Sequence, residues 1–108
     1  PVRKINKEHA KSILLPRLAE LAGRHGFRYA KVSLRRQKTL WASCSSQNNI
    51  SLNIALAALP QELIDYVLLH ELVHTKIKNH SKKFWRELDK YIPNAKHQDR
   101  KLRQFCLR

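Results

Sequence analysis

An apolar segment from residue 63 to residue 77 constrains the fold of this chain more than any other stretch. Its apolar residues would project almost all round a helix, and a helix that is apolar on nearly every side is a buried one. The same segment contains two histidines and a glutamate, His70, Glu71 and His74. Burying imidazoles and a carboxylate costs free energy unless these groups are hydrogen-bonded, paired or bound to a metal. The segment therefore predicts a buried helix with a polar site built into it.

The spacing of these polar residues follows helix geometry. Residues four apart on an α-helix lie roughly 40° from each other and one turn along the axis. His70 and His74 can therefore reach one metal ion from the same face, and with Glu71 they form the H-E-x-x-H zinc pattern. Glu71 falls to the side of the pair, which suits a base acting on metal-activated water. The alternative is a pair of core histidines satisfied by neighbouring side chains, with Glu71 in a salt bridge.

A catalytic zinc site usually has three protein ligands and leaves its fourth position for water. His80 is the leading candidate for the third ligand, because it lies just past the end of the helix, where the chain can turn back toward the metal. Glu87, on the next expected helix, is the runner-up, and Asp89 and His97 are further alternatives.

The separation of His70 and His80 is the one found in metzincins, whose pattern is H-E-x-x-H-x-x-G-x-x-H. Ile77 stands where those enzymes have glycine, and the chain contains no methionine with which to form a Met-turn. The sequence therefore excludes a standard metzincin.

The remaining segments predict an α+β domain around the buried helix. Asn6 can cap a first helix that reaches about His25, with Pro16 expected to kink or split it. Period-two alternation of apolar residues then predicts a three-stranded, mostly antiparallel sheet. Its strands should cover residues 29–35, 39–44 and 50–54.

The buried helix should run over 61–77, with Asn79 as a left-handed stop. Ser81 is expected to cap a helix over 82–91, and a basic helix over 96–108 should follow, anchored by Leu102 and Phe105. With 108 residues, the chain is large enough for one core and too small for two. Residues 1–108 should therefore form a single domain.

The net charge is +14, from 22 Lys and Arg against 8 Asp and Glu. Such an excess attracts polyanions, but the basic residues are dispersed along the chain, which weakens a nucleic-acid function. No signal peptide or hydrophobic stretch of membrane length occurs, so we expect a cytoplasmic protein with no membrane partner. Cys44 and Cys106 lack metal-binding or disulfide spacing, and we expect Cys44 to be a small buried thiol.

Several motifs in the same order resemble the YgjP-like predicted metal-dependent hydrolases, which are related to the SprT and WLM zinc peptidases. They are RRQK at 35–38, WASCSS at 41–46, NISLN at 49–53, DYV at 65–67, HELVH at 70–74 and NHSKKFW at 79–85. The resemblance implies a minimal zincin fold with zinc bound by His70, His74 and His80 and with Glu71 as catalytic base. Ala42 departs from the family pattern, in which the tryptophan is usually followed by glycine.

The chemistry expected of this chain is zinc-dependent hydrolysis of peptide bonds, with Glu71 passing a proton from water to the leaving amine. Its partner would be a peptide or protein substrate, which can add as a strand along a sheet edge near residues 49–53. One alternative is a DNA-associated SprT-like protease or nucleic-acid-binding module. The other is a catalytically silent or latent metal-binding domain.

Four further residues have a structural and a functional interpretation. Asn53 is expected to satisfy a turn rather than to bind substrate. Tyr66 precedes His70 by one turn and could offer its hydroxyl near the metal, although a core tyrosine with a local partner is the simpler reading. Trp41 and Trp85 are expected in the core.

Overall fold

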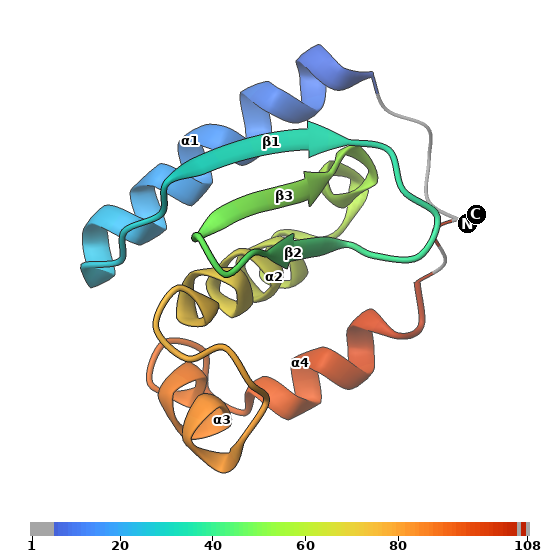
Figure 1. The fold of residues 1–108 in the computed structure, drawn as a ribbon. Coiled ribbons are helices and arrows are strands. Elements are labelled where there is room, and N and C mark those ends of the chain that lie inside the picture. Colours follow the sequence, from blue (N-terminus) through green and yellow to red (C-terminus); the bar gives the residue numbers. More distant parts are fainter. Residues whose placement is uncertain (1–5, 106, 108) are drawn as a thin grey trace.

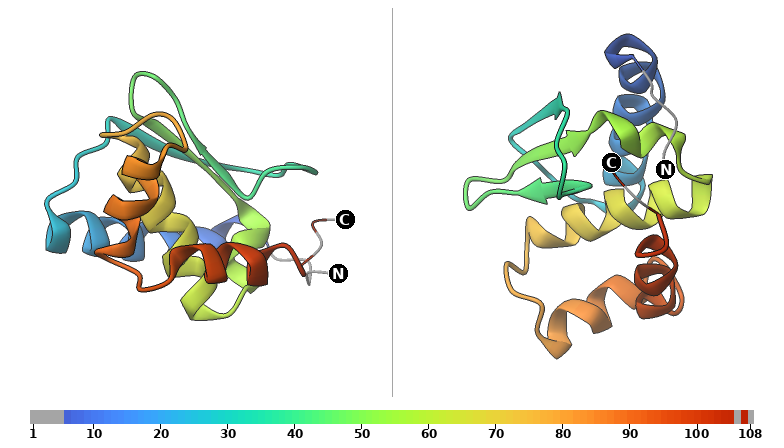
Figure 2. Two further views of the ribbon diagram at one scale, coloured as in Figure 1. Left: turned by 90° about the horizontal axis from the view of Figure 1, so that it is seen from below. Right: turned by 90° about the vertical axis from the view of Figure 1, so that its right-hand side faces the viewer.

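The computed structural model of the protein describes residues 6–105 and residue 107, and these residues form an α+β fold (Figure 1). The elements in chain order are α1 (Lys7–His25), β1 (Lys31–Arg35), β2 (Ala42–Cys44), β3 (Asn49–Asn53), the 3₁₀-helix η1 (Ile54–Ala58), α2 (Gln61–His74), α3 (Lys82–Asp89) and α4 (Ala95–Leu102). Helices α1 and α2 cover one face of the sheet, while α3 and α4 lie beside α2 beyond the β2 edge (Figure 2). The predicted fold class is confirmed.

The sheet has the strand order β1-β3-β2. Strand β1 pairs with β3 in parallel over five residues, and β2 pairs with β3 antiparallel over three. The expectation of a mostly antiparallel sheet is therefore wrong for the longer pairing. Ile50 and Leu52 explain the arrangement, because both are almost completely buried and so place β3 in the middle of the sheet.

Because β3 is the central strand, the prediction that a substrate adds to the sheet along residues 49–53 is wrong. Residues 49–53 hydrogen-bond to a strand on each side, so they offer no edge to a substrate. Strand β2 is an outer strand, and in the part of the chain that the structure describes it pairs with β3 alone.

Helix α1 begins and ends at the expected residues. The side chain of Asn6 accepts a hydrogen bond from the His9 backbone N–H at 2.7 Å, and Gly26 ends the helix with a φ of 75°. The helix is not split at Pro16, since it runs continuously from Lys7 to His25. Pro16 lies on the exposed side, where water can hydrogen-bond the carbonyl that the proline ring leaves without a donor.

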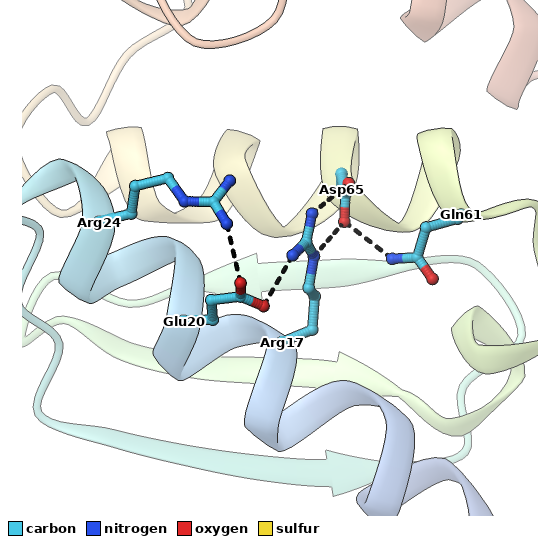
Figure 3. Close-up of polar contacts among 5 residues, drawn as sticks. All are labelled: Arg17, Glu20, Arg24, Gln61 and Asp65. Carbon is cyan, nitrogen blue, oxygen red and sulfur yellow. Dashed lines mark hydrogen bonds and ion pairs between the residues drawn. The ribbon is translucent and has the colours of Figure 1, made fainter.

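A polar network fastens α1 to α2 (Figure 3). The Arg17 guanidinium donates to both carboxylate oxygens of Asp65 at 2.8 Å. Arg17 also donates to Glu20, and Gln61 donates to Asp65. Burial alone would raise the pKa of Asp65, but the hydrogen bonds from Arg17 and Gln61 hold it below its ordinary value. This bidentate pair therefore links α1 to α2.

Helix α2 ends at His74, three residues before the predicted end. The Thr75 hydroxyl donates to the Leu72 carbonyl at 2.6 Å, and the backbone N–H of Thr75 reaches the same turn, which closes the helix. The predicted left-handed stop at Asn79 is also wrong, since Asn48 and Asn94 are the non-glycine residues with positive φ in the described part of the chain.

The C-terminal helix is shorter than predicted, because α4 ends at Leu102. Leu102 is buried as expected, but Phe105 is 39% exposed and does not anchor the segment. The predicted helix also included Cys106 and Arg108, which lie outside the described residues. No described helix has both the length and the apolar character needed to span a membrane.

Candidate metal centre

Three histidine side chains converge at the end of α2. One ring nitrogen from each of His70, His74 and His80 lies within 4.8 Å of the other two. The Nε2 atoms of His74 and His80 are 3.1 Å apart. His74 is buried, His70 is half-buried and His80 is exposed, so the cluster opens to solvent on the His80 side.

A hydrogen bond fixes the tautomer of His74. Its Nδ1–H donates to the carbonyl oxygen of Ile77 at 2.9 Å, which leaves the Nε2 lone pair facing the other rings. Burial lowers the pKa of His74, and the neighbouring His70 and His80 lower it further. The ring is therefore neutral near pH 7, the form in which an imidazole binds a metal.

Glu71 lies beside His70 and is almost completely buried. Its Oε2 atom is 3.1 Å from Nδ1 of His70, so the Nδ1–H of a neutral His70 points at the carboxylate. This arrangement leaves Nε2 of His70 free, as the Ile77 carbonyl does for His74. Metal-binding histidines usually donate the N–H of their second ring nitrogen to a carboxylate or to a backbone carbonyl.

The loop that carries His80 is tied to the turn between β2 and β3. Lys78 donates to the Ser45 carbonyl at 2.9 Å and to the side chain of Asn48. Asn48, whose φ is 64°, donates in turn to the Thr75 carbonyl at 3.3 Å. These contacts bring residues 75–80 back beside the end of α2, where His80 meets His74.

The separation of the His74 and His80 nitrogens suits a tetrahedral zinc site, and the three ring nitrogens lie within 4.8 Å of one another. With Zn–N bonds of about 2.0–2.1 Å and tetrahedral angles, two ligand nitrogens lie roughly 3.3 Å apart. The 3.1 Å between Nε2 of His74 and Nε2 of His80 is close to that value. Three imidazoles with one open side also form the donor set that zinc adopts in hydrolases. The residues present therefore fit a zinc ion.

The alternative third ligands lie elsewhere or have other partners. Glu87 accepts hydrogen bonds from Lys90 and from the Tyr91 hydroxyl, both at 3.0 Å, and these bonds lower its pKa. Asp89 accepts from the backbone N–H of Ala95 at 2.9 Å. Among the described residues, the group able to hold a metal contains neither of these carboxylates nor His97.

A cavity of about 180 Å³ opens beside His70 and Glu71. Its walls come from the segment that leads into β2, from α2 and from α4, and the residues that complete it are Thr39, Leu40, Trp41, Ala42, Tyr66, Val67, Asp99 and Leu102. Most of these side chains are apolar, so the space suits an apolar group. Ala42, which replaces the family's glycine, is an ordinary β2 residue paired with Leu52.

The contacts of Asn53 and Tyr66 support a structural role for each rather than a role in binding. The Asn53 amide donates to the carbonyls of Gln37 and Leu40 and its oxygen accepts from the Ala55 N–H, all at 2.9 Å, which confirms the turn role. Tyr66 is buried, as expected of a core tyrosine, and its hydroxyl donates to Asp99 at 2.9 Å.

The two tryptophans and Cys44 pack against the core, as expected, but they are less buried than predicted. Trp41 and Trp85 are only half-buried: Trp41 lines the cavity, and the Trp85 ring centroid is 6.2 Å from that of His70. Cys44 is half-buried rather than buried, although burial still raises the pKa of its thiol. Asp99 was missed as a cavity residue, because the sequence carries no signal that brings α4 beside α2.

The chain is similar to known metallopeptidases in sequence and in fold. The family model described as YgjP-like, metallopeptidase domain, matches residues 1–105. The crystal structure of the metallopeptidase zymogen abylysin of Pyrococcus abyssi is 34% identical, with a TM-score of 0.64 over 91% of this chain and 90% of that chain. The zymogen of Methanocaldococcus jannaschii jannalysin is 27% identical, with a TM-score of 0.61 over 94% of this chain and 97% of that chain. No match was found among the curated proteins.

Proposed function

The chain belongs to the YgjP-like metallopeptidase family, and on this basis we propose that it cleaves peptide bonds with a zinc ion bound by His70, His74 and His80. Membership makes the protein a metal-dependent peptidase that acts on peptide or protein substrates. The choice of zinc, the three ligands and Glu71 as general base are the proposal. The observation that supports it best is the convergence of three imidazoles next to a buried carboxylate.

A zinc ion held there would polarise the scissile carbonyl and lower the pKa of water to about 7. The protein supplies the rest of the chemistry. Glu71 lies on the same helix as His70 and His74, and its burial keeps its carboxylate away from bulk solvent. It would accept the proton of the attacking water and deliver it to the amine that leaves.

The free side of β2 is where an extended substrate would add to the sheet. Strand β2 contacts α2 and is preceded by the residues that wall the cavity, so a peptide paired with it passes His70 and Glu71. One side chain of that peptide would fill the cavity between Trp41, Leu102 and α2.

The family match reaches residue 105, which supports one metallopeptidase domain over residues 1–108. The comparisons give no support to a nucleic-acid-binding module or to a metal-binding domain without activity.

Cleavage of a quenched fluorescent peptide library tests the proposal. We expect turnover by the zinc-loaded protein, loss of turnover after treatment with a chelator, and recovery when zinc is returned. Cleavage that survives complete removal of metal, or a protein that binds no zinc, would contradict it.

A further inference from the structure

The three histidine rings pack around one phenylalanine, Phe84 of α3, whose side chain is completely buried. The rings of Phe84 and His74 are stacked, with centroids 4.4 Å apart and planes inclined at 24°. Phe84 meets His70 at 4.9 Å and His80 at 5.0 Å, with interplanar angles of 71° and 80°. A single apolar ring therefore contacts every imidazole of the candidate metal centre.

These imidazoles need an external constraint on their tilt. The χ2 torsion of histidine has broad preferences, so the rotamer alone does not aim a ring nitrogen at a fixed point. His70 and His74 each have an Nδ1 hydrogen bond that helps to orient them. The only hydrogen-bonding partner of the His80 ring, within the described chain, is His74. Ring contacts therefore help to orient His80, and among its ring neighbours Phe84 is the buried one that is not itself a proposed metal ligand.

The start of α3 explains why Phe84 lies there. Ser81 is the N-cap, and its hydroxyl accepts a hydrogen bond from the backbone N–H of Phe84 at 3.4 Å. His80 directly precedes this cap, and its ring lies 6.3 Å from that of Trp85, so the two rings occupy the two positions that a hydrophobic staple joins. The capped turn thus sets the positions of His80 and Phe84 together.

We propose that Phe84 is a positioning residue of the metal centre, whose ring holds the imidazoles of His70, His74 and His80 in orientations ready to bind metal. The proposal rests on the proposed function, in which these three histidines bind zinc. A phenyl ring suits the role because it has no polar atom that could compete for the imidazole nitrogens or for the metal. Locking ligand orientations before binding lowers the ordering cost of binding, so loss of the ring should weaken metal affinity.

A matched pair of variants separates this role from ordinary packing. Phe84→Leu removes the ring that contacts the histidines and keeps an apolar side chain. Phe27→Leu makes the same change at another buried phenylalanine, whose ring contacts the Tyr91 ring and the Lys76 ammonium group. Three quantities are measured on the full chain: zinc affinity by competition with a chromophoric chelator, the visible spectrum with Co²⁺ bound, and the Tm of the metal-free protein.

We expect both variants to lower the Tm of the metal-free protein. Only Phe84→Leu should weaken zinc affinity, by about 10-fold or more, and alter the Co²⁺ spectrum. Equal affinities in wild type and Phe84→Leu, or an equal loss in Phe27→Leu, would overturn the inference. A wild type that binds no zinc would instead refute the proposed function. If Phe84→Leu fails to fold, Phe84→Met, with its adaptable side chain, is compared with Phe27→Met and judged in the same way.

Discussion

The Nε2 atoms of His74 and His80 lie 3.1 Å apart, although one residue ends a buried helix and the other belongs to the loop that follows it. Because Nδ1 of His74 donates to the Ile77 carbonyl, its Nε2 presents a lone pair toward His80. Two imidazole nitrogens at this separation can bind the same metal ion. The loop between α2 and α3 is thus as important to the proposed site as the helix itself.

Glu71→Gln should keep the metal and lose catalysis. The substitution preserves the size of the side chain and keeps an amide oxygen that can accept the hydrogen bond from His70 Nδ1. It removes the basic carboxylate, so proton transfer from water is lost. We expect peptide turnover to fall by about 100-fold or more. Zinc content and turnover are measured on the same preparation, and loss of zinc from this variant would count against the assigned role of base.

Ser81→Ala should loosen the start of α3. Loss of an N-cap hydroxyl typically costs about 1 kcal/mol of stability, and here the same turn carries His80 and Phe84. We therefore expect a lower urea midpoint and weaker zinc binding than in Ser46→Ala, a change at an exposed serine of the β2–β3 turn. Equal zinc affinity in the two variants would show that the cap does not support the site.

Asn53→Ala should destabilise the fold without touching the metal centre. The substitution leaves two backbone carbonyls and one backbone N–H without their amide partner, and it should cost about 2–4 kcal/mol of unfolding free energy. Asn53→Asp should be at least as damaging, because a carboxylate would face the carbonyl oxygens of Gln37 and Leu40. Urea unfolding measures both, and a change below about 0.5 kcal/mol in either would contradict this role.

The pair of Arg17 and Asp65 should make stability depend on acid pH. The folded pKa of Asp65 lies below its ordinary value of 3.8, so its stabilising contribution is complete above that value and is lost as the pH falls through the folded pKa. Wild type should therefore be more stable than Asp65→Asn at pH 7, and the difference should shrink below about pH 4. A difference that stays constant from pH 7 to pH 3 would exclude the mechanism.

The elements with strong periodicity were predictable from the sequence. The cap at Asn6 and the apolar character of residues 63–74 depend on local chemistry, and both agree with the structure. The convergence of His80 on His74 also followed from the helix end and from the family motif.

The features that the sequence did not predict are those that depend on tertiary packing. Nothing local to β1 indicates that β3 will pair with it in parallel, because that pairing depends on which strand the core buries most deeply. The continuity of α1 through Pro16 depends on the exposure of that side of the helix. The multiple contacts of Phe84 with histidine rings appear only when α3 is docked against α2.

Metal content is the most direct test of the central claim that His70, His74 and His80 bind the metal. It is measured on wild type, His80→Ala and Glu87→Ala after purification in the presence of zinc. The account predicts one zinc per chain in wild type and in Glu87→Ala, and a large loss in His80→Ala. Retention of zinc by His80→Ala together with its loss from Glu87→Ala would contradict the account.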